Sequence, residues 1–116
     1  MSTSTRRTLG VSGEDLAADW YREHGYDVLE RNWRCRDGEL DLVARKARTL
    51  VFCEVKTRRS VAFGSPAEAV TGAKQARIRR LAARWLAERS TAGSGPIRFD
   101  VVAILPDRLD VIEAAF

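Results

Sequence analysis

Residues 50–56 read Leu-Val-Phe-Cys-Glu-Val-Lys, an apolar run that ends in two side chains of opposite charge. Apolar residues occupy both alternating sets of positions, which is typical of a central strand covered on both sides. Alternation along a strand places four of these side chains on one face: Leu50, Phe52, Glu54 and Lys56. Burying a carboxylate and an ammonium group is costly unless they pair or bind an ion. This face therefore predicts either a functional site or a buried ion pair.

A second charged face lies in the preceding segment, where we expect a strand over Glu39–Ala44. Alternation separates two carboxylates and a valine from two leucines: Glu39, Asp41 and Val43 against Leu40 and Leu42. We expect a hairpin with a four-residue loop over residues 46–49. In that register four pairs face one another: Arg45 with Leu50, Val43 with Phe52, Asp41 with Glu54, and Glu39 with Lys56.

Two carboxylates that face each other across a hairpin repel, and a divalent cation between them relieves the repulsion. Asp41 and Glu54 are therefore candidate ligands for a hard ion such as Mg²⁺ or Mn²⁺, with the backbone carbonyl of Val55 as a further ligand. A buried ion-pair cluster of Glu54 with Lys56 or a nearby arginine explains the same charges equally well. The residues alone leave both interpretations open.

The remaining patterns predict an α/β fold with one mixed sheet flanked by helices. Ser12 and Asp15 resemble a capping box, which begins a helix that ends before Gly25. A long helix is expected to begin at Ser65-Pro66-Ala67-Glu68 and to continue to about Ala87, with Gly72 as a weak point. Strands are expected over Tyr26–Arg34, Glu39–Ala44, Leu50–Thr57, Ile97–Leu105 and Leu109–Ala115. The expected order is helix, three antiparallel strands, long helix and two strands.

Length and composition exclude several classes of protein. With 116 residues, the chain has room for one compact domain, which we expect over residues 12–116 after a flexible tail over 1–11. Two cysteines, Cys35 and Cys53, and the single His24 are too few for a disulfide scaffold or a zinc site. No apolar run is long enough to cross a bilayer and no export signal is visible, so we expect a cytoplasmic protein without a membrane partner.

Charge is distributed unevenly along the chain. Residues 31–89 contain 12 Arg and 3 Lys against 6 acidic residues, a net charge of +9, whereas the remainder carries −5. A strongly basic middle segment between acidic ends indicates a surface that faces a polyanion such as nucleic acid. Arginines that only decorate solvated faces are the alternative.

The ordered set of Glu14, Asp41 and Glu54-Val55-Lys56 resembles the motif of the PD-(D/E)XK, or restriction-endonuclease-like, nucleases. Leu40 stands in place of the proline of that motif. Longer segments resemble the small uncharacterised bacterial YraN-type family, which is similar in fold to archaeal Holliday-junction resolvases. They are Arg31-Asn32, residues 38–42, 51–58, 63–70 and 98–102, and Ala115-Phe116.

The resemblance implies a restriction-endonuclease-like fold and a metal-dependent endonuclease that acts on DNA, including branched or structured DNA in repair or recombination. Asp41 and Glu54 would then hold Mg²⁺ or Mn²⁺, Glu14 would reach the metal directly or through water, and Lys56 would orient or activate the attacking water. One subunit cuts one strand, so a two-stranded substrate implies a homodimer. A catalytically silent nucleic-acid-binding module and a protein-interaction adaptor are the alternatives.

Nucleic-acid contacts are expected on both sides of this motif. Arg58 and Arg59 directly follow the Glu-x-Lys strand, and Lys74 lies within the apolar stripe of the long helix with Arg77 one turn later. A Lys74 stem that lies along the helix with its charge in water explains that residue equally well. Arg79, Arg80 and Arg84 lie farther round the helix and are expected to be solvated, with an extension of the backbone-binding surface as the alternative. Asp100 is expected to form a structural salt bridge to Arg98 or to the long helix, and the role of Glu39 stays open.

Overall fold

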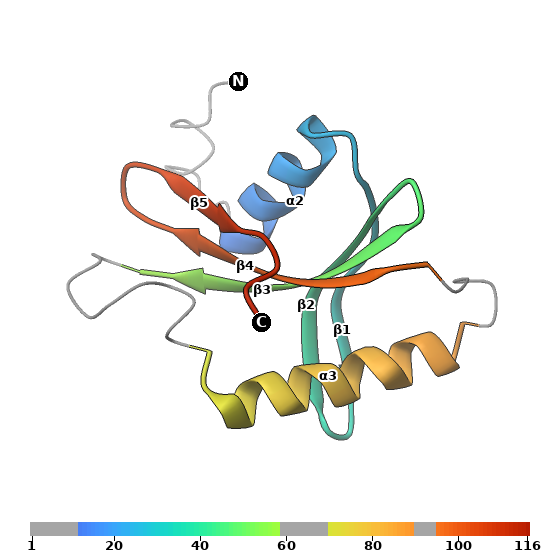
Figure 1. Cartoon of the computed structure of the whole chain (residues 1–116). Coiled ribbons are helices and arrows are strands. Elements are labelled where there is room, and N and C mark those ends of the chain that lie inside the picture. The colour runs from blue at the N-terminus through green and yellow to red at the C-terminus, as the bar shows by residue number, and fades with distance from the viewer. Residues whose placement is uncertain (1–11, 59–69, 90–94) are drawn as a thin grey trace.

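Five strands form one mixed sheet with a helix against each face, as the computed structural model shows for residues 12–58, 70–89 and 95–116 (Figure 1). Along the chain the elements are α2 (Gly13–Glu23), β1 (Asp27–Cys35), β2 (Gly38–Lys46), β3 (Thr49–Thr57), α3 (Gly72–Ala87), β4 (Ile97–Ile104) and β5 (Leu109–Ile112). The strand order is β1-β2-β3-β4-β5, and only the β3/β4 pair is parallel. The predicted mixed sheet and element order are confirmed, while the predicted tail lies outside the described residues.

Helix α2 begins where the sequence predicts. Asp15 N–H donates to Ser12 Oγ at 3.2 Å, and Ser12 N–H donates to Asp15 Oδ2 at 3.3 Å, which is the predicted capping box. The helix ends at Glu23, and Gly25 follows with a φ of +88°, a conformation that glycine adopts without strain. Local side-chain chemistry is therefore enough to set both ends of α2.

Helix α3 begins later than the sequence predicts. The start expected at residues 65–68 lies outside the described residues, but a continuous helix through Val70 and Gly72 is wrong. Thr71 is extended, and its hydroxyl accepts the N–H of Lys74 at 3.3 Å, so α3 begins at Gly72. Gly72 is therefore the first residue of the helix rather than a weak point inside it.

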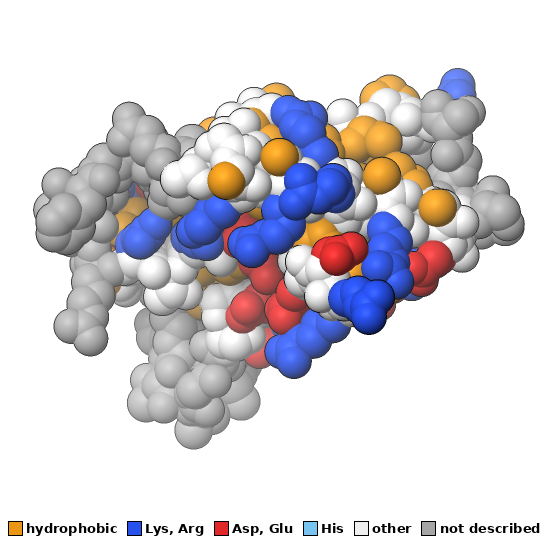
Figure 2. Space-filling model, turned by 90° about the horizontal axis from the view of Figure 1, so that it is seen from below, with side chains coloured by type: hydrophobic (Ala, Val, Ile, Leu, Met, Phe, Trp, Pro, Cys, Tyr) orange, Lys and Arg blue, Asp and Glu red, His pale blue; other side chains and the backbone are white. Residues whose placement is uncertain are grey.

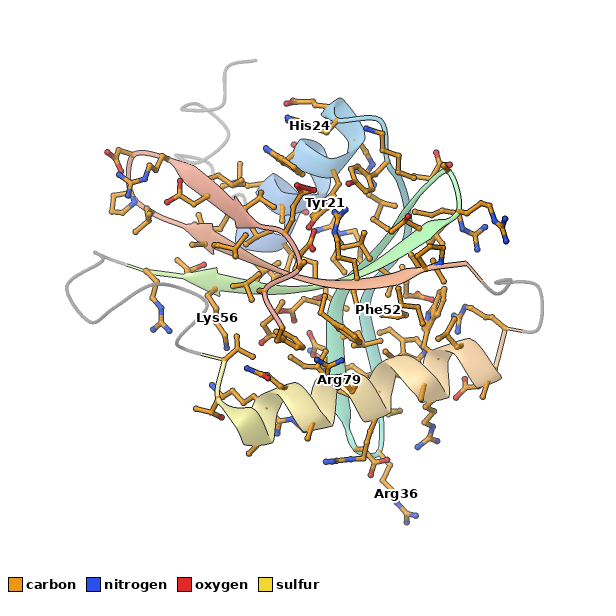
Figure 3. All side chains as sticks on the ribbon, viewed as in Figure 1. Tyr21, His24, Arg36, Phe52, Lys56 and Arg79 are labelled. Carbon is orange, nitrogen blue, oxygen red and sulfur yellow. The ribbon has the colours of Figure 1, made fainter. Side chains whose placement is uncertain are left out.

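The two helices cover opposite faces of the sheet. Tyr21 of α2 and Phe52 of β3 are both fully buried and lie on opposite sides of the sheet (Figure 3). Phe52 packs with Trp85 of α3, with ring centroids 5.7 Å apart. Helix α3 also forms part of the crossover between the parallel strands β3 and β4. No helix of the described segments is long and apolar enough to cross a membrane.

The β2–β3 register is confirmed near the turn and wrong farther along. Arg45 pairs with Leu50 and Val43 with Phe52 as predicted, but Lys46 also pairs with Thr49, which leaves a two-residue loop in place of the expected four. The ladder then stops at Leu42 and Cys53, so the predicted pairing of Asp41 with Glu54 and of Glu39 with Lys56 does not form. Beyond that point β2 continues only alongside β1, and the β1–β2 hairpin runs past α3 (Figure 1).

Two further expectations fail where the backbone bends. Leu40 packs beneath α3 in the same cluster as Val43, not with Leu42 on the other face, because strand alternation does not hold through the point where β2 leaves β3. Strand β5 ends at Ile112 rather than Ala115. Ala114 has a φ of +51°, and its N–H donates to Asp100 Oδ1 at 3.0 Å instead of continuing a ladder.

Candidate functional site

The candidate site lies where β2 and β3 separate. Asp41 Oδ2 accepts the backbone N–H of Val55 at 2.8 Å, so a side chain connects the two strands after their ladder has ended. The Val55 peptide consequently lies directly beside the Asp41 carboxylate. Its N–H is engaged by Asp41, and the role of its carbonyl as a metal ligand stays a prediction.

Glu54 and Lys56 form an ion pair on the α3 side of β3. Glu54 Oε1 lies 3.1 Å from Lys56 Nζ, and the two side chains are 19% and 21% exposed. Alternation along β3 places both on the face of Phe52, as the sequence predicts, and Figure 3 shows Lys56 on that side of the sheet. The ion pair that the residues left open as an alternative is therefore present, and it holds the Lys56 ammonium beside the Glu54 carboxylate.

A pocket of about 350 Å³ opens between the sheet and α3. Three carboxylates line its sheet side and two cations its helix side: Glu39, Asp41 and Glu54 against Lys74 and Arg77, with Gly38 and Ile78 completing the lining. Figure 2 shows acidic side chains gathered in a hollow that Lys and Arg side chains border. The predicted nucleic-acid contacts at Lys74 and Arg77 thus reach the same place as the predicted metal ligands.

The two walls of this pocket do not meet. Within the described segments, neither Lys74 nor Arg77 has a carboxylate oxygen within the 4.0 Å of an ion pair, although three carboxylates line the same pocket. Opposite charges in one pocket attract strongly when water is partly excluded. Among the described residues, the acidic and the basic side chains of the pocket nevertheless stay separate.

The carboxylates of the site influence one another. Burial raises the pKa of Asp41 to about 7, against the hydrogen bond from Val55, which favours the charged form. The negative charges of Glu54, Glu14 and Glu39 raise this pKa further. A cation near Asp41 would relieve this repulsion.

Glu14 belongs to α2, which covers the opposite face of the sheet. Its helix begins tightly packed against the end of β3, since a Cβ on Gly13 would lie 2.9 Å from Thr57 Oγ1 and 3.5 Å from Val55 Cγ1. The half-buried Glu14 follows in the first turn, close enough to raise the pKa of Asp41. Among the described residues, no three His, Cys, Asp or Glu side chains are grouped closely enough to form a complete metal cage.

The other predicted contacts have different positions. Glu39 Oε2 pairs with Arg34 Nε across the β1–β2 ladder at 2.8 Å. The charge of Glu39, whose role the sequence left open, is therefore balanced by Arg34. Arg58 is exposed, and its N–H donates to Ile104 O at 2.8 Å, which directs the chain out of β3 beside β4. Arg59 lies outside the described residues.

Asp100 is a structural residue of the opposite face. It is fully buried, and Arg98 pairs with both of its oxygens at 2.8 and 2.9 Å. The predicted salt bridge to Arg98 is therefore confirmed. Its other described partners lie outside the long helix: the Tyr21 hydroxyl of α2 donates at 2.7 Å and the Ala114 N–H at 3.0 Å. Burial and the Asp100 charge raise the pKa of Tyr21 well above its usual value. This network holds α2, and with it Glu14, against the sheet.

Sequence reasoning missed the part that Gly38 and Ile78 play in the pocket. Gly38 lies at the start of β2, against α3. Ile78 follows Lys74 by four residues, so helical spacing is the signal that places both on the same side of α3.

Comparisons with known proteins agree on one family. The model of "Uncharacterised protein family UPF0102" matches residues 13–104. A UPF0102 protein of Beutenbergia cavernae is 61% identical over 100 residues, which cover 86% of this chain and 84% of the relative. One from Nocardia farcinica is 57% identical over 86% of this chain and 78% of its own length, and one from Frankia alni is 52% identical over the full length of both. These findings confirm the resemblance to the YraN-type family. The chain belongs to the UPF0102 family.

Proposed function

We propose that this protein is a metal-dependent endonuclease of the PD-(D/E)XK type that hydrolyses phosphodiester bonds in DNA, with branched or structured DNA as its substrate. One observation carries the proposal: an acidic wall and a basic wall face each other across one pocket, and among the described residues no ion pair joins one wall to the other. A phosphodiester group fits this arrangement, because its oxygens can face Lys74 and Arg77 while a divalent cation joins it to the carboxylates.

The donor set suits Mg²⁺ or Mn²⁺. Asp41 and Glu54 offer carboxylate oxygens, the Val55 peptide lies beside them, and Glu14 is within electrostatic reach. Mg²⁺ is commonly held by one or two carboxylates, with waters and substrate phosphates as the other ligands, so a complete cage of protein side chains is not required. When bound, such an ion supplies Lewis-acid polarisation of the phosphate and lowers the pKa of a coordinated water.

The chain's own residues perform the remaining tasks. Lys56, held by Glu54 at 3.1 Å, carries donors that can orient the attacking water beside the carboxylates. Lys74 and Arg77 lie on the opposite wall, where their charges stabilise the negative charge that develops on the phosphate oxygens. Arg77 adds a planar set of donors that suits two oxygens of one phosphate.

A catalytically silent nucleic-acid-binding module is the second candidate. The Glu54–Lys56 ion pair favours it, because each side chain already has a partner in the absence of substrate. In that case the carboxylates would have a structural role, and the basic residues alone would bind the nucleic acid.

Cleavage of a panel of single-stranded, duplex, flap and four-way-junction DNA with Mg²⁺ or Mn²⁺ tests the proposal. Wild type is compared with Glu54→Gln and Lys56→Ala, and with Arg108→Gln as a control at an exposed position near the β4–β5 turn. We expect wild type and the control to cut at least one substrate class, and the two site variants to bind that substrate without cutting it. Binding by all four proteins with no cutting in either metal would replace the nuclease by the binding module.

The oligomeric state during cleavage tests the homodimer. Cutting both strands of a junction symmetrically requires two copies of the site, so wild type should sediment on the junction as two protein chains per DNA. One chain per junction with complete cleavage of both strands would exclude the dimer.

A further inference from the structure

Helix α3 has an unusual charge pattern. Its 16 residues, Gly72–Ala87, contain five cations and no acidic residue: Lys74, Arg77, Arg79, Arg80 and Arg84. Arg77 and Arg80 are three residues apart and Arg80 and Arg84 four apart, which are spacings at which like charges repel on a helix. A helix that only needs a solvated surface is stabilised by mixing both signs, so this pattern has a cost that a polyanion would offset.

Three of these arginines form one stripe. At 100° per residue, Arg77, Arg80 and Arg84 lie within about 60° of one another around α3. Arg79 lies on another side, where its guanidinium is over the rings of Phe99 and Phe116, 4.8 and 5.4 Å from their centroids. Arg79 therefore packs on aromatic rings and is not part of the stripe.

The stripe begins at the pocket and extends along α3 to the turn of the β1–β2 hairpin. Arg77 lines the pocket, and a Cβ on Gly38 would lie 3.8 Å from Arg77 Cδ. At the other end of the stripe, Arg84 Nη1 lies 3.5 Å from Asp37 Oδ2. Arg36 precedes Asp37 in the hairpin turn and is exposed, and Figure 3 shows its side chain extending away from the tip.

We propose that Arg77, Arg80 and Arg84, together with Arg36 at the hairpin tip, form a track for the sugar-phosphate backbone of the nucleic acid that leaves the pocket. The track rests on the proposed function for its starting point, because Arg77 belongs to both. On α3, Arg77 and Arg84 are seven residues apart, which corresponds to about 10 Å along the helix axis. This length matches about three phosphates along one strand. Such contacts fix the position of the nucleic acid and carry no base specificity.

The residues in and around the stripe favour nucleic acid over a membrane or a protein partner. Arg36 and Arg80 have no ion-pair partner among the described residues, so their charges are free to face phosphates. The exposed residues beside the stripe are small, with Ala76 and Ala83 rather than aromatic side chains. A membrane-bound helix or a protein interface would need large apolar groups there.

The test measures binding to duplex DNA without metal, in EDTA, so that it does not depend on cleavage. The double variant Arg36→Gln/Arg80→Gln is compared with Arg22→Gln/Arg108→Gln, which removes the same charge from exposed positions of α2 and the β4–β5 turn. Each lost phosphate contact lowers the salt slope of the binding constant by about 0.9. We expect the slope to fall by about 1.8 in the first variant only, with roughly tenfold weaker binding at moderate salt and an unchanged melting temperature in both.

The outcomes separate this inference from the proposed function. Equal loss of binding in both double variants, or no loss in either, would overturn the track, even if wild type cuts DNA. A fall in slope confined to Arg36→Gln/Arg80→Gln would support the track, even if wild type never cuts. Binding of vesicles with anionic headgroups that falls in this variant, with DNA binding unchanged, would assign the stripe to a lipid surface and overturn the proposal.

Discussion

Replacing Asp41 by asparagine should stabilise the metal-free protein at alkaline pH. Asp41 is half-buried near Glu54, Glu14 and Glu39, and this environment raises its pKa from the usual 3.8 to about 7. Asparagine keeps a side-chain oxygen that can accept the Val55 N–H and removes the charge. The substitution therefore removes repulsion without removing the hydrogen bond between the strands.

The size and sign of the effect follow from linkage. A carboxyl whose pKa is higher in the folded state binds its proton more tightly there, so stability is highest below pH 4 and falls as the pH rises to about 7. Three pKa units correspond to about 4 kcal/mol, and solvent screening at a partly exposed site reduces this to about 2 kcal/mol. For a chain of this size that is a difference of about 8 °C in melting temperature.

Thermal unfolding followed by tryptophan fluorescence, with EDTA present, measures the difference between Asp41→Asn and wild type from pH 4 to pH 8. We expect equal melting temperatures near pH 4 and a growing advantage of the variant up to pH 8. Asp110→Asn, which loses an exposed ion pair with Arg108, should show no such growth. A variant that melts at or below the wild-type temperature at pH 8 would refute the electrostatic reasoning.

Three further results are expected. Mg²⁺ or Mn²⁺ should raise the melting temperature of wild type at pH 8 but not that of Glu54→Gln, as measured by calorimetry; equal shifts in both would remove Glu54 from the metal site. Tyr21→Phe leaves Asp100 with one donor fewer and should lower the free energy of unfolding, measured in urea, by about 1–3 kcal/mol. Tyr26→Phe keeps the Arg98–Asp100 pair and should lower the free energy of unfolding by less. Gly13→Ala should lower the free energy of unfolding by about 1–3 kcal/mol, because its Cβ would lie 2.9 Å from Thr57 Oγ1. Adding Thr57→Ala to this variant should recover part of the loss. Full stability of Gly13→Ala alone would contradict the close packing of α2 on β3.

Features that depend on near neighbours in the chain were predictable from the sequence. The capping box of Ser12 and Asp15 was predictable because its partners are three residues apart. The pairing of Arg45 with Leu50 and of Val43 with Phe52 followed from a short hairpin. The shared face of Phe52, Glu54 and Lys56 followed from strand alternation.

Features that depend on distant segments were not predictable. The ladder between β2 and β3 stops before Asp41 because β2 continues with β1 past α3, which no local pattern within residues 39–56 records. Glu39 consequently pairs with Arg34 rather than Lys56. In the same way, Tyr21 rather than the long helix completes the environment of Asp100, 79 residues later in the chain.

In the candidate site, the sequence determines which residues are unusual, and the tertiary structure decides which of them face one another. Residue types and spacing were enough to single out Asp41, Glu54 and Lys56 as charges in an apolar context, because burying a charge is costly wherever it occurs. That Lys74 and Arg77 face these carboxylates across a pocket, without pairing with them in the described part of the chain, depends on how α3 packs on the sheet. Helical periodicity decides which side chains share a side of α3, but packing of Phe52 against Trp85 decides what that side meets.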